Sequence, residues 1–312
     1  MAPYRHIFGP VASRRLGRSL GVDIVPAKYC SLDCIFCEVG RTTLKTTERR
    51  PYLAPGPIIE ELKAFLAQAP TPDYVTITGS GEPTLNTYLG QIIDQIRAIT
   101  TRPIALLTNG TLFYRPDVRQ EAAKADVVLP TLDAPDQETF ERIHRPDPTI
   151  RLEQVVEGLV QFRRQYQGQI WLEVFVVAGI NTDPGKVQQL KALIGRISPD
   201  KIHLNTAVRP TADQDVPVPP LSTLERIAAT LGPNCQLIVD PKDLSTGSDL
   251  HVDAQMVLAL LQRRPSTLAQ LADGLAVTTE ALRPVIEQML SSGQIAAEQW
   301  ADNVFYRPAH PA

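Results

Sequence analysis

The chain has 312 residues, of which 43% are hydrophobic and 21% charged, a composition that fits a globular protein with room for a small second domain. No apolar run approaches the ~20 residues that a membrane-spanning helix needs, and the N-terminal segment lacks the apolar block of a signal peptide. We therefore expect a cytoplasmic protein. Four cysteines are too few for a disulfide scaffold.

Positive charge is concentrated near the N-terminus. Residues 1–50 carry nine lysines and arginines but four acidic residues, although the formal net charge of the whole chain is -3. Such an end could receive an acidic electron donor or an anionic substrate. Arg14, Arg15 and Arg18 are candidates for binding a phosphate or a carboxylate, and the alternative is that they are solvated surface residues.

From residue 19 the chain alternates short β-rich runs with amphipathic helical patterns. Strand-like runs cover residues 19–25, 74–78, 103–108, 127–132, 170–177, 201–208 and 236–239. Helical patterns cover residues 57–69, 86–100, 117–125, 151–166, 186–197 and 222–232. These repeated units predict an α/β fold with a parallel sheet. Six or seven strands suit an open doubly wound sheet or a partial barrel, and both bind ligands at the carboxyl ends of the strands.

The motifs that could carry chemistry follow these strands. GSGEPTL comes after residues 74–78, TNG after 103–107, the segment with Asp133 after 127–132, and AGIN after 170–177. NTAVRP ends the run that begins at residue 201. We therefore expect one site at this edge of the sheet, with the proline-rich residues 208–220 forming a surface loop nearby.

The pattern changes after about residue 250. Helical patterns at 252–264, 266–275 and 278–293 precede strand-like runs at 295–300 and 303–308, which is the element order of a winged helix. The sequence thus predicts domains at 1–248 and 249–312. The presumed recognition helix holds Arg283 against Glu280 and Glu287. Since duplex binding needs a positive face, we favour a peptide, protein or subunit contact over nucleic acid.

The segment KYCSLDCIFCEVG places three cysteines at the spacing Cys-x3-Cys-x2-Cys. Three thiolates around an iron-sulfur cube leave one iron open, and the amino and carboxylate groups of a methionine moiety fit that position. The alternative is a zinc site closed by Cys235 or by a histidine. The histidines available for that role are His6, His144, His203, His251 and His310. Cys235 is more simply a buried small hydrophobe.

This spacing, with Phe36 before the last cysteine, resembles the defining motif of the radical S-adenosylmethionine superfamily. The resemblance implies a partial (β/α)6 TIM-like barrel and a [4Fe-4S] cluster held by Cys30, Cys34 and Cys37. It also implies reductive cleavage of S-adenosylmethionine to a 5'-deoxyadenosyl radical. A low-potential electron donor such as flavodoxin or ferredoxin would be needed.

Other landmarks of the superfamily recur in order. By resemblance, Ser80, Gly81, Glu82 and Pro83 match the segment that holds the cofactor's amino group, with Ser80 where many members have glycine. Glycine lets the backbone approach closely there. The same resemblance assigns Asn109 and Asp133 to the ribose and carboxylate side, and Phe36, Val177, Gly179 and Ile180 to the adenine side. Asn205 and Arg209 project from the last predicted barrel strand, and we expect them to meet cofactor or substrate. Each assignment has an alternative as a local turn or as core packing.

The opening IFGPVASRRLGRSLGVDIVPAKYCSLDCIFC resembles a bacterial and archaeal group in the branch of the tRNA wyosine-base synthases. Those enzymes carry extra cysteines upstream of the main motif, whereas this chain has none before Cys30. We therefore expect one cluster. His144 and Arg145 in ERIHRPDP are assigned to an exposed polar loop, and no catalytic residue beyond the cofactor site is identified.

The leading hypothesis is thus a radical S-adenosylmethionine enzyme acting on a substrate that the sequence does not name. Three alternatives stay open. The first is a peptide- or protein-modifying enzyme whose winged helix holds the substrate, and the second is a tRNA-base modification of the wyosine type. The third is a non-catalytic iron-sulfur regulator.

Overall fold

An eight-stranded sheet forms the centre of the chain in the computed structural model, which describes residues 4–68, 71–238, 254–275, 277–300 and 303–309. The sheet consists of β1 Ile7–Ser13, β2 Gly17–Asp23, β5 Tyr74–Thr78, β6 Ile104–Thr108, β7 Val127–Pro130, β8 Gln169–Val176, β9 Lys201–Thr206 and β10 Cys235–Leu237. The strands lie in this same order across the sheet. β1 is antiparallel to β2, and every other neighbouring pair is parallel. A doubly wound sheet reverses its order, so this is the singly wound order of a partial barrel.

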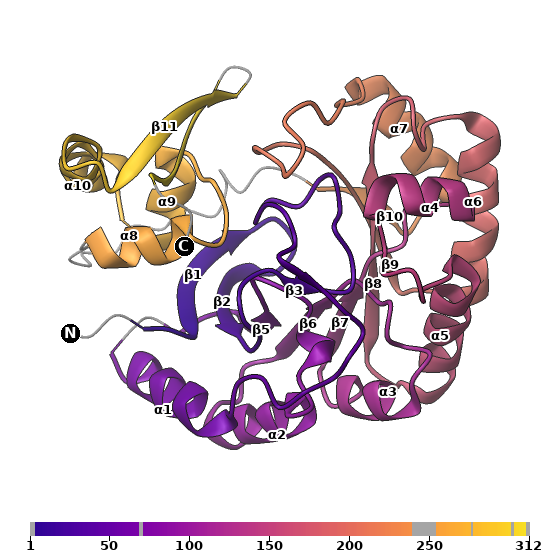
Figure 1. Ribbon diagram of the computed structural model, residues 1–312, viewed down its shortest axis with the longest axis horizontal. Coiled ribbons are helices and arrows are strands. Elements are labelled where there is room, and N and C mark those ends of the chain that lie inside the picture. Colours follow the sequence, from indigo (N-terminus) through magenta and orange to yellow (C-terminus); the bar gives the residue numbers. More distant parts are fainter. Residues whose placement is uncertain (1–3, 69–70, 239–253, 276, 301–302, 310–312) are drawn as a thin grey trace.

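Helices fill the crossovers between the parallel strands and lie along the outer side of the curved sheet (Figure 1). They are α1 Pro55–Leu66, α2 Leu89–Ile99, α3 Pro116–Ala122, α4 Gln137–His144, α5 Leu152–Gln165, α6 Pro184–Ile197 and α7 Leu221–Leu231. Three of them begin at a proline. Proline suits the first turn of a helix because a backbone N–H there has no carbonyl partner within the helix, so its absence costs no hydrogen bond. No helix within the described ranges has the length and apolar character required to cross a bilayer.

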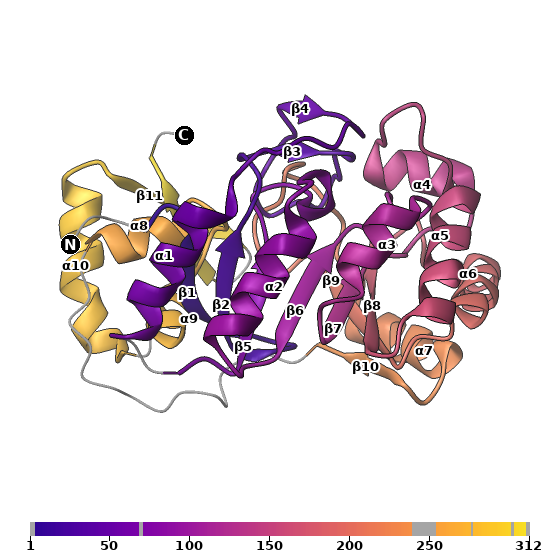
Figure 2. The same ribbon diagram turned by 90° about the horizontal axis from the view of Figure 1, so that it is seen from below.

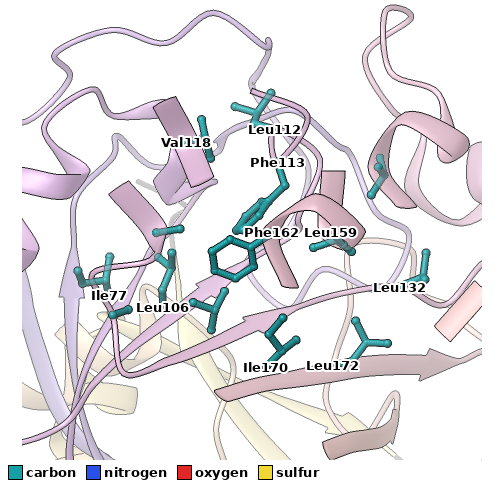
Figure 3. Close-up of a cluster of buried hydrophobic side chains, with 14 of the residues drawn as sticks. Ile77, Leu106, Leu112, Phe113, Val118, Leu132, Leu159, Phe162, Ile170 and Leu172 are labelled. Atoms are coloured by element: carbon teal, nitrogen blue, oxygen red, sulfur yellow. The ribbon is translucent and has the colours of Figure 1, made fainter. Parts of the chain in front are cut away.

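The main core lies between the helices and the sheet (Figure 3). Phe113 and Phe162 are fully buried and meet edge to face, with ring centroids 4.7 Å apart. The ring of Phe162 also stacks on Tyr166 at 4.6 Å. Leu106 and Ile170 from the sheet belong to the same cluster. This aromatic group fixes α5 against the strands whose ends carry the site.

Two elements of the barrel, β1 and α4, were not predicted from the sequence. β1 has no clean alternation of apolar residues, because Gly9 and Pro10 interrupt it and its register against β2 shifts between Phe8 and Val11. The other element, α4, has only eight residues, most of them polar. Its N-cap, Asp136, accepts a hydrogen bond from the backbone N–H of Thr139, which is a start signal for a helix.

Two short strands lie beyond the carboxyl ends of the sheet (Figure 2). β3 Tyr29–Cys30 pairs in parallel with β4 Leu44–Lys45. β3 belongs to the segment that carries the three clustered cysteines, which therefore lies over the end of the barrel. Residues 28–40 are called the cysteine loop below.

The C-terminal module comprises α8 Ala254–Leu261, α9 Leu268–Leu275, α10 Thr279–Ser291 and the antiparallel hairpin of β11 Ile295–Trp300 and β12 Asn303–Pro308. It has its own hydrophobic cluster, which Phe8 and Val11 of β1 join. The guanidinium of Arg263 lies over the Phe8 ring at 4.2 Å. The module therefore packs on the edge strand (Figure 1). The predicted domain boundary at 248/249 lies outside the described residues.

We expect Phe162→Ala to lower the free energy of unfolding of the metal-free protein by about 3–5 kcal/mol, because it removes a buried ring from a packed aromatic group. Chemical denaturation followed by circular dichroism measures this loss. Arg164→Ala, at an exposed position two residues along α5, is the matched control and should change stability by less than about 0.5 kcal/mol. Equal effects of the two substitutions would show that the aromatic group does not stabilise the barrel.

Candidate active site

A cavity of about 320 Å³ lies at the carboxyl ends of the strands. Its wall is built from the cysteine loop, the segments after β5 and β6, residues in and after β7, residues of β8 and β9, and the turn between β1 and β2. His144 of α4, Arg209 from the segment after β9 and Arg264 from the segment after α8 complete it. Parallel strands bring the segments that follow them to one edge, whereas the turn between β1 and β2 precedes β2 and enters the cavity from the opposite, amino edge of the sheet. The cavity therefore coincides with the edge where the sequence predicts a site.

Most of the residues selected from the sequence line this cavity. They are Arg14, Arg15, Cys30, Cys34, Phe36, Cys37, Gly81, Glu82, Pro83, Asn109, Asn205 and Arg209. Ser80, Asp133, Val177, Gly179 and Ile180 are not among its lining residues. The Ser80 hydroxyl donates to Asp23 Oδ2 at 2.8 Å, and Val177 and Ile180 pack in a small apolar cluster with Phe175. Arg18 also lies elsewhere, 3.6 Å from Asp73.

The cysteine loop is joined to the segment after β5 by two backbone hydrogen bonds. The N–H of Lys28 donates to the carbonyl of Ser80 at 2.7 Å, and the N–H of Glu82 donates to the carbonyl of Tyr29 at 2.9 Å. A Cβ at Gly81 would lie 2.1 Å from the Tyr29 oxygen, closer than any side chain can come. Gly81 is thus required by this contact, and the contact fixes Glu82 beside the thiols.

Each clustered sulfur has a nitrogen of another side chain beside it. Asn109 Nδ2 donates to Cys30 Sγ at 3.5 Å, and Lys28 Nζ donates to Cys37 Sγ at 3.4 Å. His144 Nδ1 lies 3.1 Å from Cys34 Sγ. Hydrogen bonds to metal-bound sulfur adjust the potential and the orientation of such sites. Lys28 of the cysteine loop and Asn109 after β6 therefore donate to two of the thiols, and His144 at the end of α4 lies against the third.

His144 was placed in an exposed loop from the sequence, and that prediction is wrong. The residue ends α4, is 3% exposed and lines the cavity. Its Nε2 donates to Asp133 Oδ1 at 2.6 Å, and Asp133 is fully buried. The spacing of Phe140, Ile143 and His144 on one helical face is the signal that could have found it. Lys28 was also missed, since a lone lysine before a cysteine has no helical or strand pattern.

The environment keeps two of the thiols protonated in the metal-free protein. Burial, with the negative charge of Glu82 beside it, raises the pKa of Cys30 to about 12. Burial and the neighbouring cysteines raise the pKa of Cys34 well above its ordinary value. Thiolates here need a compensating cation, so metal binding would release protons. This donor set fits a cationic metal centre.

Glu82 is held by four hydrogen bonds and is 2% exposed. Its carboxylate accepts from Thr84 N–H and Oγ1, from Thr108 Oγ1 at 2.6 Å and from Asn109 N–H at 2.8 Å. Burial nevertheless raises the pKa of Glu82, against the opposing effect of these donors. A carboxylate fixed in this way can receive an ammonium group that enters the cavity.

Aromatic rings form another part of the wall. Phe36 of the cysteine loop stacks on Phe175 of β8 with ring centroids 3.9 Å apart and an interplanar angle of 10°. Phe36 also meets His144 edge to face at 5.5 Å. The stacked pair offers a flat apolar surface beside Cys37, the kind of surface on which a heteroaromatic base packs.

Of the described residues considered as a fourth zinc ligand, His144 alone lines the cavity, with its Nδ1 3.1 Å from Cys34 Sγ. Cys235 packs against the main core from β10 and does not line the cavity. His6 and His203 do not line it either, and His251 and His310 lie outside the described residues. Within the part of the chain that the structure describes, no three His, Cys, Asp or Glu side chains form a group that could hold a single metal ion.

Comparisons with known proteins give a consistent result. A model of the Radical SAM superfamily matches residues 24–188. The chain is 32% identical to a UPF0026 protein of Helicobacter pylori over 96% of both chains. It is 31% identical, over 38% of its length, to the S-adenosyl-L-methionine-dependent tRNA 4-demethylwyosine synthase of Pyrococcus abyssi. That match covers 40% of the synthase.

Another relative, from Brachyspira hyodysenteriae, is called GTPase Obg and is 33% identical over 94% of this chain. The chain spans only 44% of that protein, and its sequence contains no G-x-x-x-x-G-K-[S/T] segment for a nucleotide phosphate. Among solved structures, a radical SAM methyltransferase from Sphaerobacter thermophilus aligns with a TM-score of 0.51 and 16% identity. It covers 70% of this chain and 66% of that one, a likeness of fold.

The pKa of Cys30 predicts a pH profile for alkylation. In the metal-free folded protein, the initial rate of Cys30 modification by iodoacetamide should rise about tenfold per pH unit from pH 7 to 10, because only the thiolate reacts. In urea the same cysteine should level off near pH 9, its ordinary range. Peptide mass spectrometry measures both rates. A plateau near pH 9 in the folded protein would contradict the raised pKa.

Proposed function

Because the chain belongs to the radical SAM superfamily, and at nearly full length to the UPF0026 family related to the wyosine-synthase branch, we propose that Cys30, Cys34 and Cys37 hold its [4Fe-4S] cluster. The cluster and S-adenosylmethionine are the cofactors of this superfamily. The enzyme would cleave S-adenosylmethionine reductively and direct the resulting radical at a further substrate. The observation that carries the proposal is the meeting of the three thiols and Glu82 at one cavity.

The donor set supports the cluster. The three thiols line the cavity from one loop, and the charges of Cys30 and Cys37 act on Cys34. Separate irons of a cube suit this arrangement. The raised pKa of Cys30 and Cys34 in the metal-free state also supports a cationic metal centre.

The segment after β5 supports the S-adenosylmethionine site. Glu82 and the backbone around Gly81 would receive the ammonium of the methionine moiety, and the stacked Phe36 would receive the adenine. Asn109 donates a hydrogen bond from its backbone N–H to Glu82 and another from its side-chain amide to Cys30 Sγ. It would therefore fix the S-adenosylmethionine site relative to the cluster site. Asn205 donates to Glu173 Oε1 at 2.9 Å and would face the far side of the cofactor.

When bound, the cluster supplies the electron that breaks a carbon–sulfur bond of S-adenosylmethionine. The chain's own residues orient the reactants and exclude water. The cavity walls of Leu32, Leu107, Leu129 and Phe175 are apolar, which protects a reactive carbon radical from side reactions. We propose a flavodoxin- or ferredoxin-type donor for the electron.

The C-terminal module would serve substrate recognition. We propose that it is a winged helix, on the support of its element order of three helices and a hairpin. Arg264, which follows α8 of the module, lines the cavity. The module would therefore lie next to the reacting groups. A module that contributes to the cavity favours an enzyme over a regulator that acts at a distance.

Anaerobic reconstitution with iron and sulfide, followed by dithionite and S-adenosylmethionine, should yield 5'-deoxyadenosine. We expect the Cys30→Ala, Cys34→Ala and Cys37→Ala variants each to lose this product by at least about a hundredfold, because each removes one ligand of the cluster. Chromatography of the reaction mixture measures it.

Cys235→Ala is the matched control, since Cys235 is half-buried in β10 and does not line the cavity. It should retain both iron content and product. Formation of 5'-deoxyadenosine by the Cys34→Ala variant, or its absence from the intact reconstituted protein, would contradict the proposed function.

Lys28→Met should lower the midpoint potential of the cluster by tens of millivolts. The ammonium of Lys28 donates to Cys37 Sγ and stabilises the more negative, reduced state, so its removal makes reduction harder. A redox titration followed by electron paramagnetic resonance measures the shift. Lys191→Met, at an exposed position of α6, should leave the potential unchanged, and an upward shift in Lys28→Met would refute the assigned role.

A further inference from the structure

Four arginines from three separate parts of the chain line the site cavity. Arg14 and Arg15 lie in the turn between β1 and β2, Arg209 follows β9, and Arg264 follows α8 of the C-terminal module. Guanidinium groups in a cavity wall lose part of their hydration, so each needs a negatively charged partner to compensate. Their partners within the protein therefore decide what the wall can bind.

Two of the four are neutralised by carboxylates in the same wall. Arg15 lies 3.1 Å from Glu173, and Arg209 lies 3.2 Å from Glu38. Arg14 and Arg264 have no carboxylate within ion-pair distance among the residues that the structure describes. The wall thus holds four guanidiniums and three carboxylates, those of Glu38, Glu82 and Glu173, and Arg14 and Arg264 form an ion pair with none of the three.

The surplus charge is costly in the empty cavity. Burial lowers the pKa of Arg14, and the positive charge of Arg209 lowers it further. The same two causes lower the pKa of Arg264 to about 9, which still leaves it charged at neutral pH. An anion between these side chains would replace the lost hydration and screen their repulsion.

A second cavity of about 470 Å³ adjoins this part of the wall. Arg14 and Arg209 line both cavities. The second cavity is bounded by Gln270, Trp300 and Phe305 of the C-terminal module and by other residues that include Val208 and Val218, which are 40% and 49% exposed. The arginines therefore stand where a path from the module meets the site.

None of the four arginines belongs to residues 24–188, the region that matches the superfamily model. That region contains the cysteines and the Glu82 segment, which are the parts proposed for the shared cofactors. Members of one superfamily share a fold and differ mainly in their substrates. Residues outside the shared region are therefore candidates for binding the substrate of this protein.

We infer that Arg14, Arg209 and Arg264 form a subsite for an anionic group of the substrate, a carboxylate or a phosphate, at the junction of the two cavities. The inference rests on the proposed function, because that function requires a substrate. Binding of an anion at the subsite does not itself require the cluster. Planar guanidinium forks match both anions through paired hydrogen bonds. The remainder of the substrate would extend over the aromatic wall of the C-terminal module.

The test is calorimetric titration of the reconstituted full-length protein with inorganic phosphate, pyrophosphate and succinate. The intact protein should bind at least one of these probes, and the probe preferred tells a phosphate substrate from a carboxylate one. The double variant Arg14→Gln/Arg264→Gln should weaken that binding by about tenfold or more, since charge-assisted hydrogen bonds are lost. Arg283→Gln, exposed on α10 of the same module, is the matched control and should bind as the intact protein does.

Three outcomes would overturn the inference: none of the probes binds the intact protein, the double variant binds like the control, or the double variant loses affinity for S-adenosylmethionine by the same factor. The last would assign the arginines to the cofactor's own carboxylate. If the double variant does not fold, Arg264→Lys tests the same point, because it keeps the charge but loses the fork. Probe binding without any 5'-deoxyadenosine production would instead refute the proposed function and leave the anion subsite standing.

Discussion

The contact between Gly81 and the Tyr29 carbonyl is the constraint on which the rest of the site depends. Two backbone hydrogen bonds join the cysteine loop to the segment after β5, and only a glycine permits the approach. Because β5 and β6 are neighbours in a parallel sheet, the same contact brings Asn109 to both Glu82 and Cys30. The order of the strands thus determines that thiols, carboxylate and amide share one cavity.

The cavity divides into two electrostatic regions. Around the thiols, the amide of Asn109 and the ammonium of Lys28 donate to sulfur, an arrangement that suits added negative charge on a cluster. Elsewhere in the wall, arginines exceed their acidic partners, and one of them comes from the C-terminal module. The module therefore completes the site as well as packing on β1. The similarity to a UPF0026 relative likewise extends over 96% of the chain rather than over the barrel alone.

Most strands and the parallel sheet could be predicted from the sequence, because strand periodicity is a local signal. Short motifs are local too, and nine of the residues that they assign to the cofactors line the cavity. Such local signals miss what depends on tertiary approach. His144 is the last residue of the short polar helix α4, and only the fold turns it toward Cys34. Arg264 follows α8 of the second module, more than two hundred residues from the cysteines. Ser80 and Asp133 show the reverse case, since their motifs indicate a ligand while their side chains bond to Asp23 and His144.

The central claim is that three cysteines leave one iron free for the methionine moiety of S-adenosylmethionine. Electron–nuclear double resonance on the reduced, reconstituted protein, with S-adenosylmethionine labelled by ¹⁵N at its amino group, tests this directly. The account predicts a resolved ¹⁵N coupling that disappears when unlabelled cofactor is substituted. A cluster spectrum that is unchanged by the cofactor, with no ¹⁵N coupling, would mean that all four irons are already ligated by the protein and would contradict the account.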